Sequence, residues 1–160
     1  MLAKFLKSLP AVAIAFGVFA FVTFFFPAVR MHFQYFEPTD VLELVSAYNG
    51  WGVVFGVKNG EFQFSFMNFL TYLLPLIGCA FVFLKEWTNN KLFAYCSIIV
   101  FLLAGVFFLL IKNFSVISFE YDDKKYFLDH LKLGAGAIFG SISCFIAALC
   151  TFADYYFNKL

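Results

Sequence analysis

Two histidines, His32 and His130, are the side chains of this sequence best suited to chemistry. Four carboxylates lie near the second histidine in sequence: Glu120, Asp122, Asp123 and Asp129. Imidazole and carboxylate groups together can bind a metal ion or exchange protons with a substrate. No ligand spacing such as His-x-x-x-His accompanies them, which favours a solvated acidic loop. The sequence therefore predicts no catalytic residue, no metal site and no cofactor.

The cysteines lie within uncharged apolar stretches: Cys79, Cys96, Cys144 and Cys150. None belongs to a Cys-x-x-Cys pair, which argues against a zinc site and against thiol-oxidase chemistry. Buried cysteine commonly serves as a small apolar side chain, so we expect four separate structural thiols. The segments between the apolar stretches contain no cysteine and no disulfide can staple them, a pattern typical of a bacterial protein.

The composition restricts the class of protein more strongly than any motif. Hydrophobic residues make up 63% of the 160 residues and charged residues only 13%, whereas a soluble domain carries about a quarter. This balance excludes a water-soluble enzyme and a disordered chain. A net charge of +1 also argues against a nucleic-acid-binding protein, which needs a basic face. The composition predicts an integral membrane protein.

Four stretches contain no Lys, Arg, Asp or Glu: residues 9–29, 66–84, 92–111 and 133–153. A helix of about 20 residues spans the roughly 30 Å of a bilayer core, so each stretch predicts one transmembrane helix. The first is too long for the apolar region of a cleaved signal peptide. We expect an all-α membrane protein, with residues 1–160 forming a single four-helix domain. Because no span carries a charge, a proton- or ion-coupled transporter is disfavoured.

The distribution of basic residues predicts the orientation. Residues 1–8, 85–91 and 154–160 together hold five Lys or Arg in 22 residues, whereas residues 30–65 and 112–132 hold six in 57. Since cytoplasmic segments are richer in Lys and Arg, both termini are expected in the cytoplasm. The expected location is the plasma membrane.

The 36-residue segment between the first two spans reads as a folded cap. Asn59-Gly60 is the strongest two-residue hairpin signal and predicts a hairpin of strands 53–57 and 62–66. Asp40 and Glu43 fit a capping box that opens a short helix ending at Asn49-Gly50. Further strands are expected at 31–36 and 115–121. These elements predict a small extracytoplasmic sheet of two to four strands, which either caps the bundle or docks another protein.

One arc of the last span consists of small residues and the opposite arc of bulky ones. Four small residues form its ridge: Gly136, Gly140, Cys144 and Ala148. Helices in lipid associate where small side chains let backbones approach, so this ridge is expected to meet another helix, inside the monomer or across an oligomer seam. Ala13, Gly17 and Ala20 of the first span are a candidate mate. Phe145 and Leu149 are expected to face lipid or a looser neighbour.

The second span places Asn68, Thr71, Pro75 and Gly78 on roughly one face. Pro75 removes a backbone hydrogen bond and predicts a kink near the middle of the helix. Such breaks mark ligand sites in transporters, so Asn68, Thr71 and Pro75 are a candidate pore or ligand face. In most small bundles the same features serve packing only.

These observations favour a non-enzymatic integral membrane protein, either an accessory subunit of a membrane complex or a self-assembling four-span protein. Its expected partners are the lipid bilayer and either another protein or further copies of the chain, with no nucleic acid. A pore or carrier for a hydrophobic or lipid substrate, formed by oligomerisation, is the first alternative. An enzyme at the outer interface that uses His32 and His130 is the second.

Overall fold

The computed structural model describes residues 2–36, 41–57, 62–117 and 130–157. Its elements, in chain order, are α1 (Leu2–Val22), η1 (Thr23–Phe25), β1 (Pro27–Phe36), β2 (Val41–Asn49), α2 (Gly50–Phe55), β3 (Phe62–Gln63), α3 (Phe66–Thr88), α4 (Lys91–Leu110), β4 (Val116–Ile117), β5 (Leu131–Leu133) and α6 (Ala135–Phe157).

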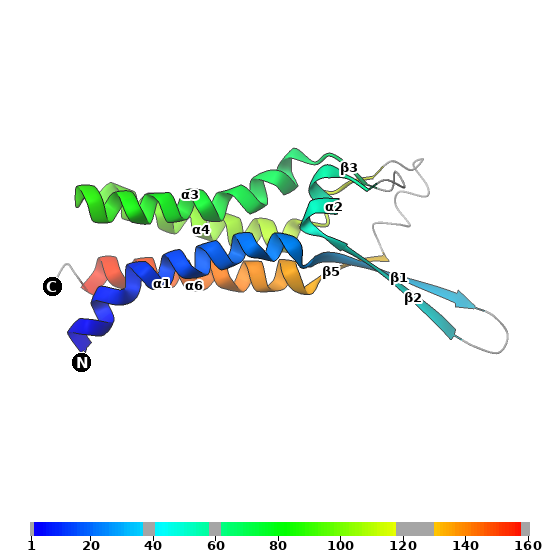
Figure 1. Ribbon diagram of the computed structural model, residues 1–160, viewed down its shortest axis with the longest axis horizontal. Helices are drawn as coiled ribbons and strands as arrows, with labels where there is room; N and C mark the ends of the chain where they lie inside the picture. Colours follow the sequence, from blue (N-terminus) through cyan, green and yellow to red (C-terminus); the bar gives the residue numbers. More distant parts are fainter. Residues whose placement is uncertain (1, 37–40, 58–61, 118–129, 158–160) are drawn as a thin grey trace.

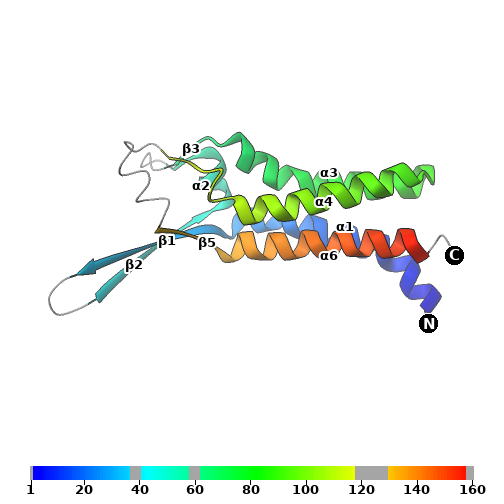
Figure 2. The same ribbon diagram turned by 180° about the vertical axis from the view of Figure 1, so that it is seen from behind.

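Four of the described helices, α1, α3, α4 and α6, are long and apolar enough to cross a membrane, which confirms the four predicted helices. They form an elongated bundle in which α1 and α4 each pack against both α3 and α6 (Figures 1 and 2). Neighbouring helices run in opposite directions. The strands gather at one end, here called the sheet end, while α1 begins and α6 finishes at the opposite end, here called the terminal end.

The first helix is shorter at its sheet end than predicted, because residues 27–29 belong to β1 rather than to the span. Phe26 adopts an extended backbone with φ −93° and ψ 162°. A residue that precedes proline is disfavoured in the helical region, so Pro27 ends the helical path and starts the strand. The last helix likewise begins at Ala135, two residues later than predicted, because Leu133 lies in β5.

A serine and a phenylalanine four residues apart join α4 to α3. The Ser97 hydroxyl donates to the carbonyl oxygen of Gly78 at 3.3 Å. The Phe101 ring covers the same glycine so closely that a β-carbon on Gly78 would lie 2.7 Å from it. Phe101 also reaches Gly17 of α1, where a β-carbon would lie 2.9 Å from the ring. One buried ring therefore fills the space between three helices.

The same arrangement joins α6 to α4. The Ser141 hydroxyl donates to the carbonyl oxygen of Gly105 at 2.9 Å, and the Phe145 ring covers that glycine. Phe145 and Leu149 are expected from the sequence to face lipid or a looser neighbour. Phe145 is half-buried with its ring against Gly105 of α4, whereas Leu149 is 67% exposed. On α6, Phe145 therefore lies at the border between the face that packs on α4 and the exposed face of bulky residues.

The predicted small ridge of α6 lies inside the bundle. Gly136, Gly140, Cys144 and Ala148 are all buried. A β-carbon at Gly140 would lie 2.7 Å from the Phe108 ring of α4. One at Gly136 would lie 3.0 Å from the carbonyl oxygens of Thr23, Phe26 and Pro27, where the chain passes from η1 into β1. Ala13, Gly17 and Ala20 of α1 are buried as well.

The paired strands β1 and β2 form an antiparallel arm that projects beyond the sheet end (Figures 1 and 2). β5 pairs with the other edge of β1 at its root, giving the strand order β2-β1-β5. One face of this root is buried, through Val29, Met31 and Leu131. The predicted strand at 31–36 is thus confirmed within a longer one.

A close backbone contact fixes the root of the arm to the bundle. The Gly134 N–H donates to the carbonyl oxygen of Ala28 at 2.8 Å. A β-carbon on Gly134 would lie 2.2 Å from the carbonyl oxygen of Pro27, so only glycine permits this approach. The direction of β1 is therefore set by its contact with the start of α6.

Two local predictions for the segment after β1 are wrong. The helix predicted from Asp40 is the strand β2, because Val41–Asn49 pairs with β1 along its whole length and tertiary pairing overrides a local capping signal. Asp40 itself lies outside the described residues. Asn49 does not end a helix but caps the next one, since its side chain accepts a hydrogen bond from the Gly52 N–H at 3.0 Å.

The strand predicted at 53–57 is mostly the short helix α2. Val53 and Val54 are adjacent and both fully buried, which a half-exposed strand does not allow. The expected Val57–Phe62 pairing is nonetheless present as a 3.3 Å hydrogen bond from the Val57 N–H. β3 then pairs with β4, in the region of the strand predicted at 115–121. The predicted turn residues Asn59 and Gly60 lie outside the described residues.

We expect Gly140→Leu to lower the melting temperature of the protein in detergent without changing its particle mass. The added side chain would enter the space of the Phe108 ring, and overpacking costs about 1–3 kcal/mol. Leu149→Phe is the control, because residue 149 is exposed and has room for the larger ring. A fall in particle mass with unchanged monomer stability would instead place the small ridge at an oligomer seam.

Candidate functional site

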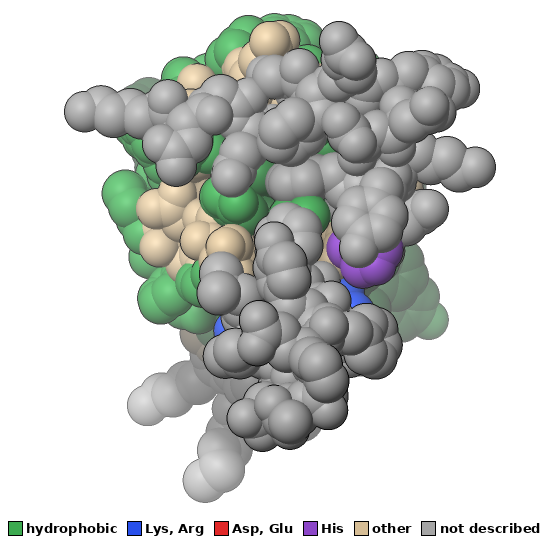
Figure 3. Space-filling model, turned by 90° about the vertical axis from the view of Figure 1, so that its right-hand side faces the viewer, with side chains coloured by type: hydrophobic (Ala, Val, Ile, Leu, Met, Phe, Trp, Pro, Cys, Tyr) green, Lys and Arg blue, Asp and Glu red, His purple; other side chains and the backbone are tan. Residues whose placement is uncertain are grey.

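The pairing of β1 with β5 brings the two chain segments that contain the histidines to the root of the arm. In the antiparallel β1–β5 ladder, Arg30 is opposite Lys132 and Met31 is opposite Leu131. The next positions along the two chains are His32 and His130, although the described ladder stops one step before them. In Figure 3, which looks onto the sheet end, the described histidine side chain lies beside Lys or Arg side chains.

The register alone does not make a metal centre. Among the described residues, no group of three or more His, Cys, Asp or Glu side chains could hold a metal ion. The carboxylates predicted to help, Glu120, Asp122, Asp123 and Asp129, lie outside those residues. The enzyme built on His32 and His130 stays a hypothesis.

The predicted ligand face of α3 is buried, and its polar groups have local partners. The Asn68 side-chain nitrogen donates to the carbonyl oxygen of Val53 and to the Ser115 hydroxyl, both at 3.2 Å. The Thr71 hydroxyl donates to the carbonyl oxygen of Met67 at 2.9 Å in its own helix. Pro75 is buried as well, and Figure 1 shows α3 bending toward its Phe66 end.

Asn68 belongs to a polar clasp that closes the sheet end, formed with Ser65 and Ser115. The Ser65 hydroxyl accepts from the Asn68 N–H and donates to the carbonyl oxygen of Phe114 at 2.6 Å. The Ser115 hydroxyl donates to the carbonyl oxygen of Ile111 at 3.0 Å. The clasp thus joins the start of α3 to the end of α4. The side-chain oxygen of Asn68 is buried and has no hydrogen-bond partner among the described residues.

The four cysteines are free thiols, and Cys79 and Cys144 are buried. Cys79 packs beside Gly17, and its sulfur is 3.6 Å from the carbonyl oxygen of Ile14. Small side chains at these positions let the helices approach one another.

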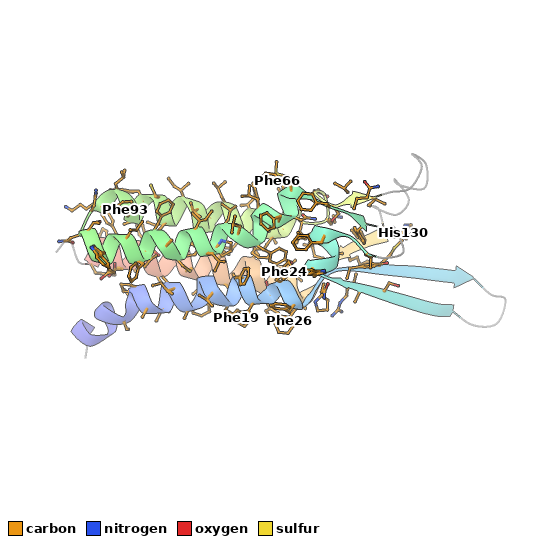
Figure 4. All side chains as sticks on the ribbon, turned by 45° about the horizontal axis from the view of Figure 1, so that its top comes forward. Phe19, Phe24, Phe26, Phe66, Phe93 and His130 are labelled. Atoms are coloured by element: carbon orange, nitrogen blue, oxygen red, sulfur yellow. The ribbon has the colours of Figure 1, made fainter. Side chains whose placement is uncertain are left out.

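An aromatic pocket of about 190 Å³ lies between α1, α2 and α3 at the sheet end. Its lining is Phe21, Phe24, Trp51, Phe55, Phe69, Tyr72 and Leu73. The Phe24 ring, labelled in Figure 4, lies 4.9 Å from the Tyr72 ring and 5.8 Å from Trp51, measured between ring centroids. Trp51 is 57% exposed, so the pocket is open at the bundle surface. An engineered apolar cavity of about 150 Å³ binds benzene, so a small apolar group or a short length of lipid chain fits here.

Gly50 allows this pocket to form. A β-carbon at residue 50 would lie 2.7 Å from both the Tyr72 ring and the carbonyl oxygen of Phe24. The Tyr72 hydroxyl lies against this glycine and, among the described residues, has no hydrogen-bond partner. Sequence reasoning missed this pocket, because its residues come from four separate elements in an aromatic-rich chain.

An ion pair at the terminal end was also missed. Lys85 of α3 forms a salt bridge with Asp154 of α6, and a second with its neighbour Glu86 at 2.6 Å. The Asp154 side chain is only 3% exposed and that of Lys85 15%. The sequence did contain a signal for this pair. Lys85 and Asp154 are each the first charged residue after an uncharged stretch, and the two stretches cross the bundle in the same direction, so both residues lie at the same end. The pair connects two helices that stand diagonally in the bundle.

Comparison of the chain with protein-family models, with curated proteins and with solved structures found no match.

We expect Lys85→Met to destabilise the protein more than Asp154→Asn. Removing the lysine takes the ammonium away from a buried carboxylate, and breaking a buried pair in this way costs about 3 kcal/mol. Asp154→Asn leaves Lys85 with its Glu86 contact, so its cost is smaller.

Thermal unfolding in detergent measures both variants. Lys91→Met is the matched control, because Lys91 is exposed at the same end of the bundle. Equal costs for Lys85→Met and Lys91→Met would show that the diagonal pair contributes nothing to stability.

Proposed function

We propose that the four long helices form a transmembrane bundle of a multi-pass protein in the plasma membrane. Bulky apolar side chains are exposed along all four helices, among them Phe19, Phe83, Ile99 and Leu149. A surface of this kind in water would cause association, whereas lipid chains cover it without cost. The orientation proposed from the basic residues places both termini in the cytoplasm and the sheet end outside.

Exposed aromatic residues at both ends of the bundle support this placement. Trp51 and Phe66 are 57% and 62% exposed at the sheet end. Trp87 and Tyr156 are 78% and 56% exposed at the terminal end. Trp and Tyr are enriched where a membrane protein crosses the two interfaces of the bilayer.

We infer that the protein is a non-enzymatic accessory subunit whose β1–β2 arm binds a protein partner outside the membrane. A single observation carries this proposal: β1 pairs with β2 as far as Phe36 and Val41, whereas β5 covers only Val29–Met31. Within the described residues, the rest of the arm is a two-stranded ribbon, which is marginally stable alone. Its free edges present unpaired backbone groups to which a partner strand can add.

The root of the arm supports the same proposal. The hydrogen bond from Gly134 to Ala28 and the tight contact at Pro27 hold β1 in a fixed direction relative to α6. Because its root is held in place, the arm loses less conformational entropy on binding than a loop without such an anchor would. In this proposal the bundle anchors the protein in the membrane, and the arm binds the partner protein.

A carrier for a hydrophobic or lipid substrate is the second candidate function. The aromatic pocket favours it, because the pocket is apolar and open toward the proposed lipid. A pore formed by oligomerisation is less well supported, because Asn68, Thr71 and Pro75, which would line it, are buried within the single chain.

A photo-crosslinking amino acid in place of Ala47 or Gln34 tests the arm directly in cells. We expect a discrete protein adduct from these arm positions and none from Leu149, which is exposed on α6 far from the arm. An adduct of twice the chain mass identifies a self-assembling protein, and a different mass identifies another subunit. The same crosslinker in place of Phe69 tests the pocket. Lipid adducts from that position, with no protein adduct from the arm, would contradict the proposed partner binding by the arm and favour the carrier.

A further inference from the structure

Two cations stand opposite each other across neighbouring strands at the root of the arm. Arg30 of β1 and Lys132 of β5 are direct partners in the ladder, and both are exposed. Their neighbours Val29, Met31 and Leu131 are buried on the other face of the sheet. Since side chains alternate along a strand, both cations belong to the exposed face, with β-carbons about 5 Å apart.

This arrangement is unfavourable without an anion. Like charges directly opposite each other destabilise a pair of strands. In the part of the chain that the structure describes, neither the Arg30 nor the Lys132 side chain makes an ion pair or a hydrogen bond. An anion that contacts both would turn the repulsion into attraction.

A histidine close to Lys132 in the chain adds to this chemistry. His130 lies two residues before Lys132, directly ahead of β5, and its backbone is helical rather than extended. The His130 side chain is half-buried, and in Figure 3 the histidine surface lies beside Lys or Arg surface. A guanidinium, an ammonium and imidazole N–H groups are the donors that phosphate oxygens accept.

The position of this face in the molecule indicates which phosphate it meets. η1 ends at Phe25, which is 67% exposed, and Arg30 follows only five residues later. If the bundle spans the membrane as proposed above, the cations lie where the apolar core gives way to the headgroups.

We propose that the exposed face around Arg30 and Lys132 binds the phosphate of an anionic lipid headgroup in the outer leaflet. The planar guanidinium of Arg30 grips two phosphate oxygens, and Lys132 neutralises the remaining charge. The bound headgroup relieves the repulsion across the β1–β5 pair and stiffens the root of the arm. This proposal rests on the membrane placement, which resistance to alkaline extraction from membranes tests separately.

Thermal unfolding of the purified protein in a non-ionic detergent tests the site. Phosphatidylglycerol should raise the melting temperature by roughly 2–4 °C, and phosphatidylcholine, which has no net charge, should raise it less. Lys132→Gln should abolish this rise. Without lipid, the same variant should melt at or above the parent temperature, because one of two opposed cations is gone.

Lys112→Gln is the matched control, because Lys112 is a cation at the same end of the bundle but outside the sheet. It should keep the full response to phosphatidylglycerol. An equal response of Lys132→Gln and the parent would overturn the proposal. An equal rise with inorganic phosphate would keep the phosphate site but overturn its assignment to lipid. If the chain is released by alkaline extraction yet still responds to phosphatidylglycerol, the membrane placement fails and the phosphate chemistry stands.

Discussion

Phenylalanine rings that stand over glycines determine how closely the four helices pack. Phe101 fills the space above Gly78 and reaches Gly17, and Phe145 does the same above Gly105. A serine one turn before each ring, Ser97 or Ser141, donates a hydrogen bond to the carbonyl oxygen of Gly78 or Gly105, respectively. Lipid provides no hydrophobic force between helices, so in the proposed membrane setting such close packing and hydrogen bonds must hold the bundle together.

The sheet end depends on this packing. The chain leaves α1 through η1 and enters β1 at Pro27, where Gly134 and the start of α6 lie against it. The buried core continues from the helices into the sheet, through Phe108, Val53 and Met31. Any change in the distance between α1 and α6 would therefore move the root of the arm, its exposed cations and its proposed partner surface together.

The sequence predicted the helices well because the absence of charge over about 20 residues has one common physical cause, burial in lipid. Their small faces also followed from residue size, as at Gly140. The local structure of residues 40–57 did not, because Val53, Val54 and Phe55 are all apolar and give no period to distinguish strand from helix. The Lys85–Asp154 pair and the aromatic pocket needed the helices to be placed in space before their residues could be brought together.

The most direct measurement of the ring-on-glycine contact is a double-mutant cycle of Gly78→Ala and Phe101→Leu, followed by the free energy of unfolding. Each change alone should destabilise, the first by a clash with the ring and the second by loss of packing. Because the smaller side chain makes room for the new methyl group, the double variant should be more stable than the sum of the two changes predicts by at least about 1 kcal/mol. Effects that add to within about 0.5 kcal/mol would contradict the contact as the basis of the fold.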